Sequence, residues 1–272
     1  MFVVALAEAR GGIDQEAPAL AALLGVAPME ARAYFGAVLP HVVARLSSQV
    51  AAGDLAVRLR ARGHAVIACD AREVLPTSRF TRAHRMRFED TAFVPHDGGP
   101  ARIPYDDIEL LVHAVIKSAI LRTTHERIVN PKIGKPPTID VADVVHSEHA
   151  AERVLFVFGR TTPPCAIHET EARYLGLGRA MKPTAHANFL ETVAVLRERA
   201  PGAIYDERFT ASPISTADVG FVRDNDTPVV HAGDPAIDLQ IHLLASWLRS
   251  EHGGSPYRAE PAHDVTRSDR GA

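Results

Sequence analysis

Histidine and carboxylate side chains near the C-terminal end of the chain are spaced as metal ligands or a proton-transfer pair would be. The chain has 14 histidines among 272 residues. Asp238 and His242 lie four residues apart in a predicted helix over 234–249, so their side chains can meet, and His231 precedes this helix. Imidazole and carboxylate groups are zinc ligands, and this group therefore favours a metal-binding hydrolase as one hypothesis. The ordinary interpretation of such a pair is a surface contact.

A second set of titratable residues lies in the middle of the chain. His146, His149 and Glu152 have helical spacing, but the surrounding segment is polar and predicts a solvated stretch without support for a metal. His168 stands beside Glu169, and a carboxylate neighbour could make it a pH-sensitive contact. The alternative for His168 is an exposed histidine at the end of a strand.

The motifs of common enzyme classes are missing from the sequence. It has no nucleophile elbow, no phosphate-binding Walker loop and no dinucleotide fingerprint. Cys69 and Cys165 are too few for a disulfide framework or a cysteine-rich zinc site, and Cys69 ends an apolar run that predicts burial. We therefore expect no catalytic residues, no cofactor and no resident metal.

Positive charge is concentrated in the segment 117–135, which has a local charge of +4 because its only acidic residue is Glu126. This segment predicts an anion-binding surface, and binding to anionic headgroups or a membrane surface is a second alternative function. Nucleic acid is not an expected partner, because interleaved aromatic residues are missing. The basic residues of the segment are Lys117, Arg122, Arg127, Lys132 and Lys135.

The elements that would position these groups begin with a compact unit over residues 1–72. An apolar run at 2–7 predicts a strand, and helical periodicity follows up to Gly25. Pro28 opens a second helix, a β-branched run at 41–46 predicts a second strand, and a third helix ends at Gly63 before a buried strand. The order is therefore β-α-α-β-α-β.

This order, and the run from Gly25 to Arg32, resemble the C-terminal domain of the bacterial ribosomal stalk protein, whose general architecture ClpS-type adaptors share. The resemblance implies a three-stranded antiparallel sheet covered by three helices. Met29 stands where the stalk domain carries a lysine for factor binding, so only the fold is carried over. The expected protein-binding surface consists of Met29, Arg32 and Phe35.

Residues 80–250 predict a second α+β domain. Short strand patterns, a hairpin turn at 96–100 and an amphipathic helix around 189–196 suggest an antiparallel β-barrel closed by a C-terminal helix. This outline, with the segment 102–108, weakly resembles a bacterial pleckstrin-homology-like domain. A long polar insertion is expected at 117–152, weaker strands at 165–168 and 174–177, and a disordered tail at 253–272.

The whole-chain composition is that of a soluble protein, with 46% hydrophobic residues, a formal net charge of −3 and no long apolar segment. We therefore expect a two-domain α+β protein of the bacterial cytoplasm. Its predicted function is that of a non-enzymatic adaptor acting through protein–protein contacts. Uncovered sheet edges also predict self-association as a homo-oligomer.

Overall fold

The structure, a computed structural model, describes residues 1–37, 39–96, 101–132, 135–222 and 234–252. Within 118–150 and 216–222 it describes the course of the backbone alone. The expected tail at 253–272 and the predicted turn around 97–100 lie outside the described residues. None of the helices in the described part is long and apolar enough to cross a bilayer.

The first 70 residues form the predicted β-α-α-β-α-β unit, and its three-stranded antiparallel sheet has the order β2-β1-β3. Gly25 ends the first helix in the left-handed conformation (φ 69°), and the Ser48 side chain accepts a hydrogen bond from the Ala51 amide at the start of the third. The elements are β1 (Phe2–Glu8), α1 (Ile13–Leu24), α2 (Pro28–Gly36), β2 (His41–Leu46), α3 (Gln49–Ala61) and β3 (Ala65–Asp70).

The rest of the chain is built on a larger mixed sheet of order β11-β8-β9-β10-β4, and β12 also pairs with β8. The strands are β4 (Thr81–Arg82), β8 (Ile108–Lys132), β9 (Lys135–Gly159), β10 (Cys165–His168), β11 (Ile204–Asp206) and β12 (Ile214–Val222). A small separate sheet contains β5 (Arg87–Phe88), β6 (Ala92–Val94) and β7 (Ile103–Pro104). The helices are η1 (Ala71–Glu73), η2 (Thr77–Arg79), η3 (Tyr174–Ala180), α4 (Ala185–Arg199), α5 (Arg208–Ala211) and α6 (Pro235–Glu251).

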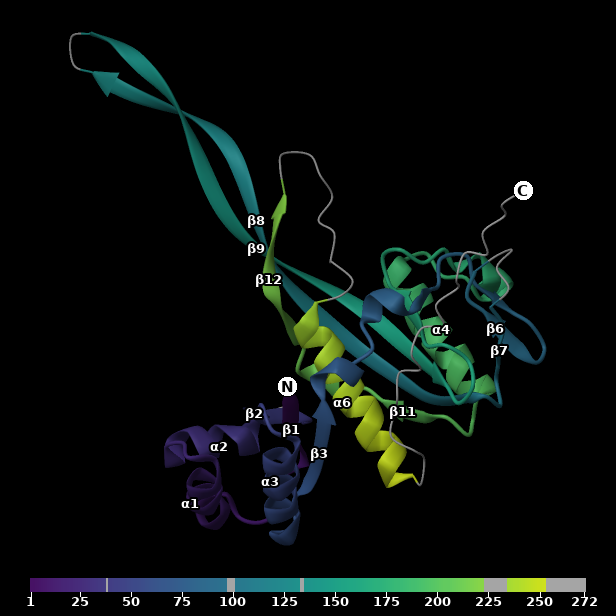
Figure 1. Ribbon diagram of the computed structural model, residues 1–272. Helices are drawn as coiled ribbons and strands as arrows, with labels where there is room; N and C mark the ends of the chain where they lie inside the picture. The colour runs from purple at the N-terminus through teal and green to yellow at the C-terminus, as the bar shows by residue number, and fades with distance from the viewer. Residues whose placement is uncertain (38, 97–100, 133–134, 223–233, 253–272) are drawn as a thin grey trace, which may run out of the picture.

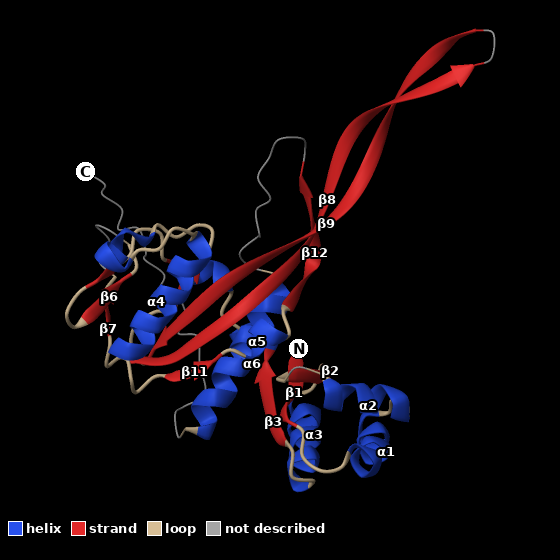
Figure 2. Ribbon diagram, turned by 180° about the vertical axis from the view of Figure 1, so that it is seen from behind, coloured by secondary structure: helices blue, strands red, loops and turns tan. Residues whose placement is uncertain are grey.

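The predicted barrel is wrong, because the described strands form open sheets (Figure 2). The predicted helix around 189–196 is present as α4, but it covers one face of the mixed sheet instead of closing a barrel. Leu111 and Leu155 pack toward Phe189 on this face, while Leu110 and Phe156 pack toward α6 on the other. Apolar side chains on both faces require a helical layer on each side, and this produces an open, covered sheet.

Helix α6 forms a middle layer between the two larger sheets. Ile241 and Leu244 contact the mixed sheet, and Leu243 packs with Val3 and Ala5 on the face of the N-terminal sheet that α1–α3 leave open. A helix buried on nearly all sides is apolar around most of its circumference, as this one is. The two parts of the chain are therefore joined by a shared core.

The insertion at 117–152, expected to be irregular, is instead an extension of two strands. Strands β8 and β9 continue as an antiparallel pair from the mixed sheet as far as Lys132 and Lys135. We call residues 118–132 and 135–150 the arm. At about 3.4 Å per residue, its strands extend roughly 50 Å, and Figure 1 shows the arm projecting away from the body.

The strand predicted at 174–177 is also wrong, because these residues belong to the 3₁₀ helix η3. Gly178, in a left-handed region (φ 53°), interrupts this element before α4 begins. The strand predicted at 165–168 is confirmed as β10.

Candidate functional site at the root of the arm

The arm begins next to Glu152 and Arg153, two consecutive residues of β9. We call these two residues and their contacts the root of the arm. Adjacent residues of a strand point to opposite faces of a sheet. Glu152 lies on the face covered by α6, and Arg153 on the face covered by α4. The short segment that follows β10 contacts both residues, through Thr170 on one face and Glu169 on the other, where the arm begins.

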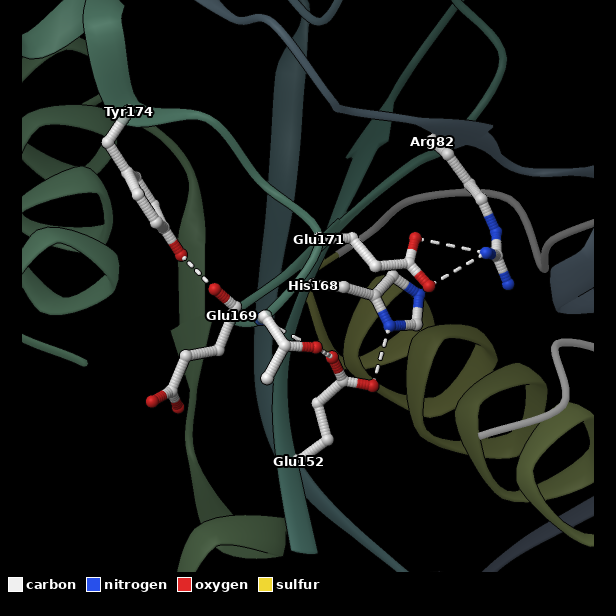
Figure 3. A network of polar contacts seen from close by, with 7 residues as sticks. Arg82, Glu152, His168, Glu169, Glu171 and Tyr174 are labelled. Carbon is white, nitrogen blue, oxygen red and sulfur yellow. Dashed lines mark hydrogen bonds and ion pairs between the residues drawn. The ribbon is translucent and has the colours of Figure 1, made fainter. Parts of the chain in front are cut away.

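Glu152 is a buried carboxylate with a complete set of partners (Figure 3). The Nδ1 atom of His168 lies 3.0 Å from its Oε2, and Oε1 accepts hydrogen bonds from the hydroxyl and the amide of Thr170. Burial alone would raise the pKa of Glu152, but the bonds from His168 and Thr170 bring it below its ordinary value. Glu152 is therefore ionised at neutral pH and anchors the loop.

On the α4 face, Glu169 is the centre of a second cluster. Arg153 Nη1 lies 3.3 Å from Glu169 Oε2, and His186 Nδ1 lies 3.6 Å from Oε1. The Tyr174 hydroxyl donates to the Glu169 carbonyl at 2.8 Å. At the surface, the adjacent Glu171 accepts two hydrogen bonds from Arg82 of β4, which ties the same loop to the sheet edge (Figure 3).

A histidine–tyrosine pair lies further into the α4 face. His113 Nδ1 is 3.2 Å from the Tyr205 hydroxyl, which donates to Glu207 at 2.8 Å. Because this hydroxyl proton is directed to Glu207, His113 must donate through Nδ1. Its Nε2 is then a buried acceptor without a hydrogen-bond partner among the described residues. Burial lowers the pKa of His113, and its ring packs against Phe189.

The charged and thiol groups of the described body are held by burial and by neighbouring protein groups. The described residues contain no cluster of three metal-ligating side chains. Cys165 is fully buried, and burial raises the pKa of its thiol far above the neutral range. Burial also raises the pKa of Cys69 to about 11. The carboxylates at the root bind neighbouring protein groups and join β9 to the segment after β10.

His168 differs from its predicted role. The exposed alternative is wrong, because His168 is buried, and its carboxylate neighbour is Glu152 across the β9–β10 ladder, not Glu169. The reason is strand alternation, which directs His168 and Glu169 to opposite faces. The helical grouping of His146, His149 and Glu152 is also wrong, because all three belong to strand β9.

The residues predicted to bind protein are not equivalent. Met29 is 76% exposed on α2. Arg32 forms an ion pair with Asp14 of α1. Phe35 is partly buried against the N-terminal core, and its ring contacts His64 edge-on at 6.2 Å. Only Met29 and part of Arg32 therefore present a surface to a partner.

The predicted anion-binding residues are distributed along the arm. Lys117 is exposed at its root. Arg122, Arg127 and Lys132 follow along β8, and Lys135 is the first residue of β9, their side chains outside the described part. Lys117 and Lys132 are about 50 Å apart along an extended strand. These positions follow the length of the arm and do not gather at one rim of the body.

Two members of the proposed metal group, Asp238 and His242, lie one turn apart in α6. Asp238 Oδ1 accepts hydrogen bonds from the Thr77 amide and hydroxyl, both at 2.7 Å, so it binds η2 to α6. His242 is buried in the same helix, and burial lowers its pKa to about 4. His231 lies outside the described residues.

Comparisons of the chain with protein-family models, with curated proteins and with solved structures gave no match.

Proposed function

We propose that this protein is a non-enzymatic protein-binding module, an adaptor that holds its partner along the arm. The observation that carries the proposal is the length of β8 and β9 beyond the body, where, within the described residues, β12 pairs with β8 as far as Arg122. A two-stranded ribbon is marginally stable by itself and exposes unpaired backbone groups on its edges. A partner that adds a strand would satisfy those groups.

The free edge of β9 is the best candidate for strand addition. Among the described residues, no strand pairs with β9 on the β10 side beyond Arg153, whose carbonyl accepts the Glu169 amide at 2.9 Å. Backbone groups alternate between the two sides of a strand. Val145 lies an even number of positions from Arg153, so its amide points to the free edge. Proline at such a position removes an edge donor without breaking the ladder to β8.

The test compares three variants as baits in native-host lysate, read by quantitative mass spectrometry. Val145→Pro should lose partner capture, while Val145→Ala, which keeps the amide, should capture as the wild type does. A third variant replaces residues 123–145 by Asn-Gly, because Arg122 pairs with His146 and a two-residue turn can close the shortened hairpin. Unchanged capture by this shortened protein would refute the proposal.

Met29 defines a second contact surface within the same proposal, because it is a large apolar side chain exposed on a helix. Met29→Ser should capture normally if the arm is the main binding element. If Met29→Ser loses capture while the shortened-arm protein captures normally, the binding surface lies on the N-terminal unit. Binding of the wild type to anionic vesicles but to no protein would instead favour a headgroup function for the 117–135 segment.

A further inference from the structure

A pocket of about 330 Å³ lies between the N-terminal unit and the end of α6. This volume is at the lower end of the range of small-molecule sites, and such sites are frequent where two parts of a fold meet. One wall belongs to the N-terminal unit and the other to the last turns of α6. The polar and aromatic lining residues are Arg10, Arg60, His64, Trp247, Ser250 and Glu251.

The N-terminal wall is cationic. Arg60 donates from Nη2 to the Val66 carbonyl at 2.8 Å, and among the described residues no carboxylate forms an ion pair with it. Arg10 is paired with Glu8 at the rim (2.7 Å). His64 is buried and accepts the Arg10 amide on Nδ1, and burial lowers its pKa, so it adds no charge at neutral pH. Arg60 therefore offers an unmatched guanidinium to the pocket.

The α6 wall has the opposite sign. Glu251 is exposed in the last turn, where the helix dipole also places partial negative charge on the terminal carbonyls. The Ser250 hydroxyl donates to the Trp247 carbonyl. Trp247 supplies apolar surface, and the guanidinium of Arg208 lies 4.5 Å from its ring centroid.

We propose that this pocket binds a small zwitterion of the α-amino acid class, with its carboxylate on Arg60 and its ammonium group on Glu251. Guanidinium groups bind carboxylates through paired, charge-assisted hydrogen bonds. A ligand with only a negative charge would be repelled by Glu251, and a ligand with only a positive charge would be repelled by the arginines. A ligand with both charges at its two ends satisfies both walls. The inference does not depend on the arm, so the shortened-arm protein should bind the same ligand.

Trp247 is the only tryptophan in the chain, so its fluorescence reports on the pocket directly. The experiment titrates the purified protein with individual non-aromatic L-amino acids at millimolar concentrations. L-Leucine is compared with L-leucinamide, which lacks the carboxylate, and with N-acetyl-L-leucine, which lacks the ammonium group. At least one free amino acid should change the fluorescence and raise the melting temperature, and its amide and N-acetyl forms should not.

Substitutions test the contributions of Arg60 and Glu251 to binding one at a time. Arg60→Gln and Glu251→Gln should each weaken binding by about tenfold or more, the usual scale for losing one charge-assisted contact. Arg58→Gln is the matched control, since Arg58 is exposed on the same helix and does not line the pocket. Glu251 lies at a helix end, so its replacement leaves the fold intact even if Arg60→Gln is unstable. Three results would overturn the proposal. They are no change in fluorescence or melting temperature with any free amino acid, equal binding of the N-acetyl form, and wild-type affinity in Glu251→Gln.

Discussion

At the scale of single residues, the structure contains two buried carboxylates with opposite electrostatic character. Glu152 accepts hydrogen bonds from an imidazole and from Thr170, and these bonds outweigh burial and lower its pKa. Asp238 receives two hydrogen bonds from Thr77, but burial dominates and raises its pKa. Ionised Glu152 therefore stabilises the fold, whereas ionisation of Asp238 opposes it.

Replacing Glu152 by Gln should destabilise the protein at neutral pH by about 1–3 kcal/mol, because a charge-assisted buried bond is lost. The pKa of Glu152 is lowered on folding, so its contribution is present above the ordinary value of 4.5 and is lost as the pH falls below it. The difference in the free energy of unfolding between the wild type and Glu152→Gln, the stability gap, should therefore disappear in acid. Urea unfolding from pH 7 down to pH 3 measures the gap, and Glu171→Gln, which changes a surface pair, should show almost none.

The substitution Asp238→Asn should change stability at neutral pH in the opposite direction to Glu152→Gln. The raised pKa of Asp238 means that its stabilising contribution is complete below 3.8 and is lost as the pH rises through the folded-state value. Asparagine mimics the neutral carboxyl group and can still accept both bonds from Thr77. In the same urea experiment, Asp238→Asn should be at least as stable as the wild type at pH 7. In acid the variant should be no more stable than the wild type. A clear loss of stability at pH 7 would contradict this account of Asp238.

At the scale of elements, the arm is the part of the fold that depends least on the core. Near Leu110–Val112, strand β8 is flanked by β9 and β11 and covered by helices on both faces. Beyond Arg122 the same strand has β9 as its only neighbour among the described residues. Two strands paired only with each other have little cooperative support.

Hydrogen exchange should therefore separate the two parts of one strand. Backbone amides of residues 123–132 are expected to exchange orders of magnitude faster than those of 108–116, because local opening of the arm needs no unfolding of the core. Mass spectrometry of peptic peptides measures both segments in one sample. Equal protection in the isolated protein would show that the arm is already covered in solution, as in a homo-oligomer.

At the scale of the whole molecule, α6 makes one body of two units that the sequence pattern divides at residues 72–80. Leu243 joins α6 to Val3 and Ala5 of the N-terminal sheet, and the adjacent Leu244 joins it to the mixed sheet. Both leucines are fully buried. Loss of either contact therefore affects both units.

Leu243→Ala and Leu244→Ala should each lower the stability of a single, shared unfolding transition by about 2–5 kcal/mol, the cost of a cavity in a packed core. Trp247 fluorescence and far-ultraviolet circular dichroism should follow the same thermal curve in both variants. Two separate transitions, with Leu243→Ala shifting only one of them, would mean that the units unfold independently.

Much of the N-terminal unit could be predicted from the sequence, because its signals are local. Gly25, Pro28 and Ser48 define helix ends through the conformations and hydrogen bonds of neighbouring residues, and the apolar spacing defines the buried faces. The exposure of Met29 also follows from its position outside the apolar stripe of α2. The sequence thereby determined the order of these elements and the absence of familiar catalytic motifs.

Only the tertiary structure decided the rest. The polar, proline-containing insertion became the arm because β8 and β9 pair with each other across many residues, and pairing of this kind leaves little local signal. His168 met Glu152 because the β9–β10 register brings them to one face. The mixed sheet stayed open because α4 and α6 cover its two faces. Helix ends depend on neighbours within a turn, whereas strand partners and shared cores depend on residues that are distant in the chain, and only folding brings these together.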